Sequence, residues 1–200
     1  MPLTSPVPRA LLAASQRRTP HITIKRAETP VEFDGVFQLN YHTYVVELGQ
    51  DVSAVTGYLV DPRCDTSVYL VAKEAEQVVG MAAITPPGHP FSLETSLADP
   101  RLVAILRHQA CEFRRLAVLP AYRHTGLYIR LAEALAQHCI QHHIPYVFIA
   151  ALESNVGLYT KLGFVPFDRP FVKGCVRYQP MICVAPNVDA TVIQPWVRRG

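Results

Sequence analysis

One junction constrains the fold of this 200-residue chain more than any other feature, a β-strand that leads directly into a long amphipathic helix. The strand begins near Glu112, and Pro120 ends it because proline lacks the N–H that a sheet requires. From about Arg123 to His142, apolar residues recur every four positions and form one helical face. They are Leu127, Leu131, Leu135 and Cys139. Such a junction is typical of α/β folds, in which helices cover a sheet.

Hydrophobic periodicity and turn residues predict the other elements. We expect strands over residues 21–26, 68–72, 78–84, 112–120 and 145–151, and a final ribbon over 164–184 that Pro180 interrupts. We expect helices over residues 29–49, 98–108, 123–142 and 155–162. This order predicts a single α/β (α+β) domain with a central mixed sheet and helices on both faces.

Residue types at the helix ends support these boundaries. Thr29 can cap a helix, with Pro30 at its first position and Glu32 in the register of a capping box. Gly163 is typical of a helix C-cap. Three apolar side chains of the helix over 98–108 are expected to share one face. They are Leu102, Ile105 and Leu106.

The composition is that of a packed globular protein. Half of the residues are apolar and 18% are charged, which excludes a disordered chain. A net charge of +3 is too small for nucleic-acid binding, and no apolar run approaches the roughly 20 residues of a membrane-spanning helix. The N-terminus lacks the features of a secretory signal, so we expect a cytoplasmic protein. Five scattered cysteines without a CxxC pair predict reduced thiols.

We expect three parts along the chain. Residues 1–20 carry four prolines among small and polar residues and are predicted to form a flexible arm. Residues 21–184 hold the predicted strands and helices and form the domain. Residues 185–200 are predicted to be a C-terminal tail, and Trp196 is the candidate residue for docking it on the domain.

A candidate phosphate-binding loop separates the strand ended by Pro120 from the helix that follows. The first N–H groups of a helix have no intrahelical partner, and the positive end of the helix dipole lies there. Gly126 lets a phosphate approach the backbone and Arg123 adds a positive charge, while His124, Thr125 and Leu127 complete the loop. Many α/β helices begin with glycine without binding a ligand, so the loop alone is a weak signal.

A second motif follows after one more strand. Residues Asn155–Phe164 contain a Leu-Tyr pair followed by Lys-Leu-Gly-Phe. In this order, the loop and the motif resemble the GNAT acyltransferase superfamily, and the resemblance spans about Thr23–Val184. It implies a sheet splayed between its fourth and fifth strands, with the phosphopantetheine arm of an acyl donor in the opening. It also implies that Asn155 helps to bind the donor and that Tyr159 is the general acid near the thioester sulfur. The alternative for Tyr159 is a tyrosine of the core.

Further segments resemble the N-acyl amino acid synthases and the related acyl-homoserine lactone synthases. They are Phe37–Gly49, Asp61 with Asp65, Glu112 three residues before Arg115, and Tyr178–Met181. This resemblance implies an acyl-phosphopantetheine donor, either acyl carrier protein or acyl-CoA, with no permanently bound cofactor. It implies an amino acid or another small amine as the acceptor.

Three residues depart from the related patterns. Asn40 stands where the lactone synthases have an arginine, and Gln50 stands where they have a tryptophan. Both changes favour the N-acyl amino acid branch. Tyr128 occupies a position where GNAT enzymes that use CoA have glycine or alanine. It either crowds a CoA pyrophosphate while tolerating the phosphate of a carrier-protein arm, or marks a degenerate donor site.

Acyl transfer to an amine requires a base, an oxyanion donor and an acid. We expect Glu112 to be the base, because an α-amine must lose a proton before it attacks; a salt bridge to Arg114 or Arg115 is the alternative. Asp65 is a second candidate base or an ammonium anchor, or else a turn cap. Arg115 is the candidate for the acceptor carboxylate, or pairs with an acid. The expected oxyanion donor is a backbone N–H among Leu116, Ala117 and Val118.

Two other clusters have competing interpretations. His138 and His142, one helical turn apart near Cys139, have the spacing of metal ligands, but no supporting acid or cysteine follows, so we expect no metal. A group of cationic residues forms either a basic rim for an acidic carrier protein or ordinary surface charge. They are Arg114, Arg115, Arg123, His124 and Arg130.

The sequence therefore predicts an N-acyltransferase that moves a medium or long acyl chain from a thioester to a small amine. An ordinary acetyl-CoA-dependent N-acetyltransferase is the alternative enzyme. A GNAT-fold binding module without turnover is the alternative outside enzymes. An apolar tunnel beside the sheet would favour a long acyl chain over an acetyl group.

Overall fold

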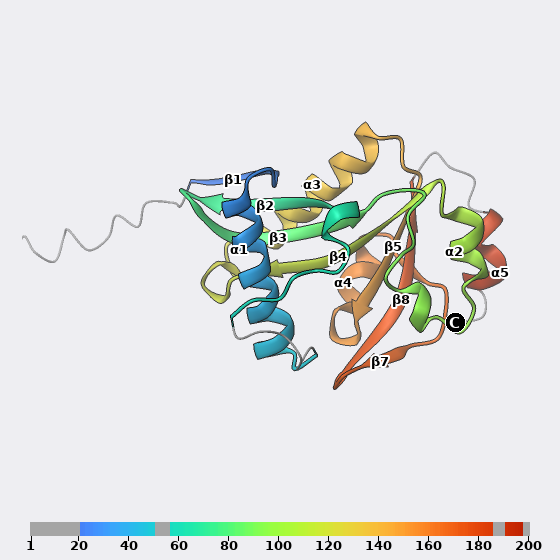
Figure 1. The fold of residues 1–200 in the computed structure, drawn as a ribbon. Coiled ribbons are helices and arrows are strands. Elements are labelled where there is room, and N and C mark those ends of the chain that lie inside the picture. Colours follow the sequence, from blue (N-terminus) through green and yellow to red (C-terminus); the bar gives the residue numbers. More distant parts are fainter. Residues whose placement is uncertain (1–20, 51–56, 186–190, 198–200) are drawn as a thin grey trace, which may run out of the picture.

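The computed structural model describes residues 21–50, 57–185 and 191–197, whose strands form one eight-stranded mixed sheet (Figure 1). The strand order is β1-β2-β3-β4-β5-β8-β6, with β7 also paired to β8. The strands are β1 (Ile22–Arg26), β2 (Val68–Glu74), β3 (Gln77–Thr85), β4 (Ala110–Val118), β5 (Tyr146–Leu152), β6 (Val165–Pro166), β7 (Phe171–Lys173) and β8 (Val176–Val184). Within the described ranges, β4 and β5 are the one parallel pair.

Helices cover both faces of this sheet, as the sequence predicts. They are α1 (Pro30–Asn40), α2 (Arg101–Leu106), α3 (Leu127–Gln141), α4 (Val156–Lys161) and α5 (Gln194–Val197). Helix α1 packs on the face that carries Met81 and Ala117, whereas α3 packs on the face that carries Val79 and Val118. Neighbouring strand residues point to opposite faces, which explains why Ala117 and Val118 meet different helices.

The start of α1 confirms the predicted capping box. The Glu32 N–H donates to the Thr29 hydroxyl at 3.3 Å, and the Glu32 carboxylate accepts from the Thr29 N–H at 3.2 Å. That buried carboxylate also pairs with Lys25 at 3.0 Å and with Lys73 at 3.2 Å. The cap therefore ties α1 to β1 and β2.

Helix α1 continues as a π-helix over Tyr41–Glu47. One extra residue per turn rotates the side chains that follow, and π-helical segments are frequent at functional sites. Gly49, with φ +61°, follows the segment, as the predicted helix end requires.

Three details of the predicted elements are wrong. In α2, Ile105 is 56% exposed and Val103 takes its place in the core beside Leu102. Helix α3 begins at Leu127 rather than near Arg123, because a 3₁₀ turn over Pro120–Tyr122 and further turn residues fill the loop first.

The third correction concerns Pro180, which does not interrupt β8. Pro180 pairs with Ala150 of β5, and its carbonyl accepts from the Phe167 N–H at 3.3 Å. The N and C=O of a strand residue lie on one side, so the missing N–H faces Phe167, just past the end of the short strand β6.

The splay predicted between the fourth and fifth strands is present. Strands β4 and β5 pair only from Ala110↔Tyr146 to Phe113↔Ile149, after which β5 pairs on with β8 and β4 with β3. A register shift between β3 and β4 places two β4 residues, Arg115 and Leu116, opposite Ala82. Arg115 has φ +53°, the left-handed conformation that a bulge of this type requires. The bulge bends β4 away from β5 and opens the sheet.

The C-terminal region contributes to the core beyond the expected domain end. Ile193 is buried among Phe91, Phe148 and Ile182, and Trp196 packs against the same cluster. The predicted arm over residues 1–20 lies outside the described residues. The boundaries of the arm, the domain and the tail stay predictions.

Candidate active site

The opening between β4 and β5 exposes one edge of β4. The Leu119 N–H donates to the Val79 carbonyl of β3, so alternation along the strand turns the Ala117 N–H toward β3 as well. The Val118 carbonyl instead accepts from Arg123 Nε at 3.0 Å. Since the N–H and C=O of one strand residue lie on the same side, the Val118 N–H faces the opening. Among the three predicted oxyanion donors, alternation favours Val118, while Leu116 lies in the bulge.

The loop that leads into α3 presents unpaired backbone donors. Gly126 has φ +77° and forms the N-cap, and no atom lies within 4 Å of the place a Cβ would occupy. The N–H groups of His124, Gly126, Leu127 and Tyr128 find no acceptor within the described ranges. Such donors at the positive end of a 15-residue helix can hold a phosphate.

Two residues of this loop already have partners. Arg123 donates to both carboxylate oxygens of Glu47, at 2.7 and 2.6 Å. The Thr125 hydroxyl donates to the Tyr122 carbonyl at 2.7 Å. Because Arg123 bridges Val118 and the π-helix, it fixes the loop against α1, and a donor phosphate would have to compete with Glu47 for its guanidinium.

Tyr159 lies in α4 and its ring meets the edge of Phe164 at a centroid distance of 5.7 Å. It is half-buried. Burial, and then the nearby Tyr128, raise the pKa of the Tyr159 phenol, so the phenol is protonated at neutral pH. A protonated phenol is a competent proton donor. Asn155 precedes α4 and is exposed, and its side chain does not cap the helix.

Further tyrosines gather around Arg115. The Arg115 guanidinium lies 5.1 Å from the ring centre of Tyr44, which the π-helix supplies. Burial raises the pKa of Tyr44, and its phenol is within electrostatic range of Tyr128, Tyr159 and Tyr178. These four tyrosines come from four elements, and the fold brings them together beside the bulge.

Asp61 is a buried acid beside the bulge that was not predicted as a site residue. Its side chain is nearly inaccessible and pairs with Arg115 Nε at 3.4 Å, and it accepts hydrogen bonds from Arg114 and from the Tyr69 hydroxyl. Burial raises the pKa of its carboxyl, but Arg114 and Arg115, together with the hydrogen bonds from Tyr69 and the Arg63 N–H, lower it overall. Asp61 therefore holds the bulge arginines. The sequence held a signal for this role, because Asp61, like Asp65, lies just before strand β2.

Asp65 is placed differently from the other candidate residues. It lies in an exposed 3₁₀ turn over Cys64–Thr66, and its carboxylate meets the Cys64 thiol at 3.6 Å. The structure does not join Asp65 to Arg115, whose acid partner is Asp61.

Glu112 is buried and held by the segment before α2. Its carboxylate accepts from the Ser92 N–H and hydroxyl, both at 2.6 Å, and from the Leu93 N–H at 3.0 Å. Burial raises the pKa of its carboxyl despite these hydrogen bonds. Neither Arg114 nor Arg115 forms an ion pair with it, so the alternative of a salt bridge is wrong. The role of Glu112 as a base stays a prediction.

Asn40 and Thr43 were not predicted as site residues. Both are buried in α1 and the π-helix, and the Asn40 amide and the Thr43 hydroxyl have no hydrogen-bond partner within the described residues. Unpaired buried polar groups are costly and are expected to have a role. The sequence marked Asn40 only as a departure from the lactone synthases, and the burial of both residues depends on how α1 docks on the sheet.

The predicted basic rim has few free charges. Arg114 and Arg115 pair with Asp61, Arg123 pairs with Glu47, and Arg130 donates to the Ile22 carbonyl at 2.7 Å. No group of three or more His, Cys, Asp or Glu side chains suited to a metal occurs in the part of the chain that the structure describes. Within that part, no helix is long and apolar enough to cross a membrane.

Comparison with known proteins identifies the family. The model of the acetyltransferase (GNAT) family matches residues 33–164, well over half of the chain. The chain belongs to the GNAT acetyltransferase family. The GNAT match includes the bulge of β4, the loop before α3 and α4. No curated protein matches the sequence significantly.

Solved structures share the GNAT fold at low identity. FeeM, an N-acyl amino acid synthase from uncultured soil microbes, is 16% identical, with 84% of this chain and 93% of FeeM covered and a TM-score of 0.67. The lactone synthase LasI is 16% identical, with coverages of 89% and 97% and a TM-score of 0.69. The CoA-dependent acyl-homoserine lactone synthase BjaI is 21% identical, with coverages of 84% and 81% and a TM-score of 0.65.

Proposed function

We propose that this GNAT protein is an N-acyltransferase that moves a medium or long acyl chain from a phosphopantetheine thioester to the amine of an amino acid or another small amine. One observation carries the proposal, the opening between β4 and β5 with unpaired N–H groups at its α3 end and Tyr159 within electrostatic range of Tyr128. Along the opening, this arrangement offers a place for the donor phosphate and then for its thioester, beside Tyr159 as the acid.

On the donor side, the backbone of the loop binds the phosphate and the pantetheine arm lies along the free edge of β4. The Val118 N–H would donate to the thioester carbonyl oxygen, and more strongly to the oxyanion that forms from it. When the C–S bond breaks, Tyr159 would transfer its phenolic proton to the thiolate sulfur. Its raised pKa keeps that proton available at neutral pH.

On the acceptor side, Arg115 would bind the carboxylate of an amino acid. Asp61 contacts Arg115 through Nε rather than through the two terminal amino groups of the guanidinium, and the guanidinium carbon lies 5.1 Å from the Tyr44 ring centre. A guanidinium held in this way is oriented before the substrate arrives. Asn40, about one turn before Tyr44, and Thr43, directly before it, have polar groups without a partner among the described residues and are further candidates for acceptor contacts.

The amine must lose a proton before or during its attack on the thioester. We assign this proton to Glu112, received through a water molecule or the Ser92 hydroxyl, which lies 2.6 Å from its carboxylate. The raised pKa of Glu112 brings it closer to the pH at which a general base is effective.

The solved structures support a thioester donor and a small amine acceptor. FeeM is described as an N-acyl amino acid synthase, and BjaI as a CoA-dependent enzyme with SAM and isopentyl-CoA. Gln50 replaces the tryptophan of the lactone synthases and donates a hydrogen bond to Tyr178, which favours the N-acyl amino acid branch. Acyl carrier protein is the proposed partner beside CoA, and a cytoplasmic location is proposed.

An acetyl-CoA-dependent N-acetyltransferase is the second candidate, because the family model is that of the acetyltransferases. Tyr128 opposes it, since a half-buried ring at the second residue of α3 narrows the space for a CoA pyrophosphate.

Native mass spectrometry of the purified protein, followed by a donor and acceptor panel, tests these alternatives. Acyl-CoA and acyl-carrier-protein donors of 2 to about 16 carbons would be offered with the common amino acids. We expect a co-purifying acyl chain and a higher kcat/KM with medium or long chains than with acetyl. Preference for acetyl-CoA would establish the second candidate, and the absence of turnover with every donor would indicate a binding module.

A further inference from the structure

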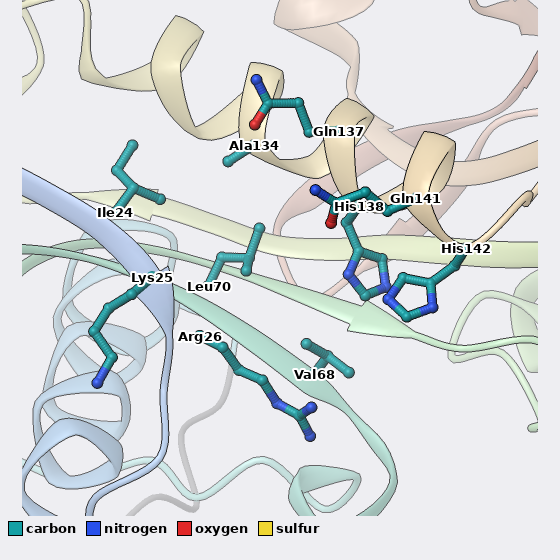
Figure 2. A pocket seen from close by; sticks show the side chains of 10 residues that line it. All are labelled: Ile24, Lys25, Arg26, Val68, Leu70, Ala134, Gln137, His138, Gln141 and His142. Carbon is teal, nitrogen blue, oxygen red and sulfur yellow. The ribbon is translucent and has the colours of Figure 1, made fainter.

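A second candidate site lies on the α3 face of the sheet, away from the opening. A groove of about 330 Å³ separates β1 and β2 from the C-terminal half of α3 (Figure 2). The groove-lining residues of α3 begin at Ala134, and His142 caps that helix. These residues follow the donor loop by about ten positions, which is roughly 15 Å along a helix. The groove is therefore separate from the loop that begins at Leu119.

The groove has an apolar floor and a polar rim. The floor consists of Ile24, Val68, Leu70 and Ala134. The rim consists of Lys25, Arg26, Gln137, His138, Gln141 and His142. No lining residue is an aspartate or glutamate. A ligand that fits must carry a charged or polar end and an apolar body.

Three cationic or protonatable side chains lie along the rim. Figure 2 shows the imidazoles of His138 and His142 side by side, and the guanidinium of Arg26 below and to the left of them, with the Val68 side chain between in this view. The two ring centres are 4.3 Å apart. The Arg26 guanidinium forms no hydrogen bond or ion pair with any described residue. The fourth cation, Lys25, is already paired with Glu32 at 3.0 Å and extends away from the histidines.

These charges repel one another in the absence of an anion. Burial, His142 and Arg26 lower the pKa of His138, in that order of effect. The last carbonyls of α3 accept from the N–H groups of His142, His143 and Ile144. The negative end of the helix dipole still favours protonated imidazoles. Arg130, on the same helix, is engaged with the Ile22 carbonyl. An anion in the groove would offset the charge of Arg26 and so reduce its effect on His138.

We propose that this groove is a binding site for a phosphomonoester with a small apolar body. A phosphomonoester carries a charge between −1.5 and −2 near pH 7 and would both pair with Arg26 and favour protonation of the neighbouring His138, whereas a carboxylate carries one negative charge. The planar guanidinium of Arg26 can donate to two phosphate oxygens, and Gln137 and Gln141 supply neutral donors at the rim. The apolar part of the ligand would cover Leu70 and Ala134.

Histidine-ring NMR of the full chain tests the proposal without reference to acyl transfer. Inorganic phosphate, phenyl phosphate and benzoate would be titrated separately at constant ionic strength. We expect saturable shifts of the His138 and His142 ring signals and a rise of the His138 pKa on binding. Phenyl phosphate should bind about tenfold more tightly than inorganic phosphate, because the apolar floor covers its ring. Binding should weaken as the pH rises and His138 loses its proton.

Two variants complete the test. Arg26→Gln should weaken phenyl phosphate binding at least about tenfold, because it removes a charge-assisted pair. His143→Gln, next to His142 but not part of the groove lining, should leave the affinity unchanged. Arg26 is exposed, so the Arg26→Gln variant should keep the fold, and circular dichroism would check that it does. The proposal is wrong if phosphate shifts only signals of the loop before α3, if benzoate binds as well as phenyl phosphate, or if Arg26→Gln binds as tightly as the parent.

Discussion

At the scale of single residues, the opening is organised by side chains that are held before any substrate binds. Arg115 is fixed between the Asp61 carboxylate and the Tyr44 ring, at a φ of +53° that an arginine rarely adopts. Backbone strain of this kind persists only when its surroundings impose it. The buried ion pairs with Asp61 supply that constraint, and they hold the Arg115 guanidinium in one orientation.

Replacing Tyr159 with Phe tests the assigned general acid. Removing the phenolic proton should lower kcat about 100-fold, which is within the range for loss of a positioned acid, and should leave the donor Kd nearly unchanged. Single-turnover kinetics and donor binding would measure the two effects separately. Tyr58→Phe is the control, because that hydroxyl donates to Asp34 outside the opening. An unchanged kcat would show that another group protonates the sulfur.

Replacing Asp61 with Asn tests the buried ion pairs. The change leaves Arg114 and Arg115 without their acid in a buried place, so the free energy of unfolding should fall by about 3 kcal/mol. Urea denaturation measures this loss. Asp65→Asn is the matched control, since an exposed aspartate in a turn should change stability by less than about 0.5 kcal/mol. Equal losses in the two variants would contradict the assignment of Asp61.

At the scale of elements, α1 and the π-helix that continues it connect the fold to the site. The π-helix presents Tyr44 to Arg115 and Glu47 to Arg123, so one short segment reaches both the bulge and the donor loop. The position of α1 on the sheet therefore decides the geometry of both. Gly35 lets the helix approach closely, because a Cβ there would lie 2.7 Å from the Val78 side chain.

Gly35→Ala should displace α1 from β3. The cost of the clash exceeds the helix propensity gained, so we expect a net loss of about 1–2 kcal/mol in the free energy of unfolding. Activity should fall as well, since Tyr44 and Glu47 move with the helix. Gly157→Ala in α4 is the control, because no atom lies within 4 Å of the added Cβ. That variant should be neutral or slightly more stable in a thermal denaturation series.

The capping box of α1 predicts a pH dependence. A backbone hydrogen bond from Glu28, together with Lys25 and Lys73, lowers the pKa of Glu32 to about 2 from its ordinary 4.5. A depressed pKa in the folded state means that this stabilisation is complete above about pH 4.5 and is lost as the pH falls toward 2. Urea midpoints measured between pH 5 and pH 2 should fall less steeply for Glu32→Gln than for the parent. Parallel curves would show that Glu32 titrates normally.

At the scale of the whole molecule, the sheet is paired continuously on both sides of the opening but not across it. Strands β1 to β4 form one half, and β5 with β6, β7 and β8 forms the other; among the described residues, the strand pairing between the halves consists of the four residue pairs from Ala110 to Phe113. A ligand in the opening contacts both halves. It should therefore stabilise the molecule as a unit.

Thermal denaturation with donor ligands tests this coupling. A ligand at 100 times its Kd should raise the free energy of unfolding by about 2.7 kcal/mol. We expect a long-chain acyl-CoA to raise the Tm more than CoA at equal concentration, because the acyl chain adds apolar contact. An equal shift with both ligands would indicate that only the phosphate and pantetheine portions are bound.

Most elements could be predicted from local sequence because local physics dictates them. The capping residues Thr29 and Glu32 place the start of α1, and the apolar repeat from Leu127 to Cys139 gives α3 its buried face. The order of the donor loop and the Tyr159 motif predicts the GNAT family, and the family match confirms it. That β8 continues through Pro180 could not be predicted from local sequence. The missing N–H of Pro180 is tolerated because of which strands lie beside it, and only the tertiary structure shows these.

Tertiary structure decided what each candidate residue touches. The resemblance to the synthases led to Asp65 as a candidate residue, but chain packing placed Asp61 against Arg115, because partners 54 residues apart meet only when β4 joins the sheet. It likewise paired Glu47 with Arg123, buried Asn40 without a hydrogen-bond partner among the described residues, and placed Arg26, His138 and His142 along one groove. Residue types and short-range periodicity determine the helices and strands and the family. Burial and pairing between distant segments determine the charge states and contacts of the candidate site residues.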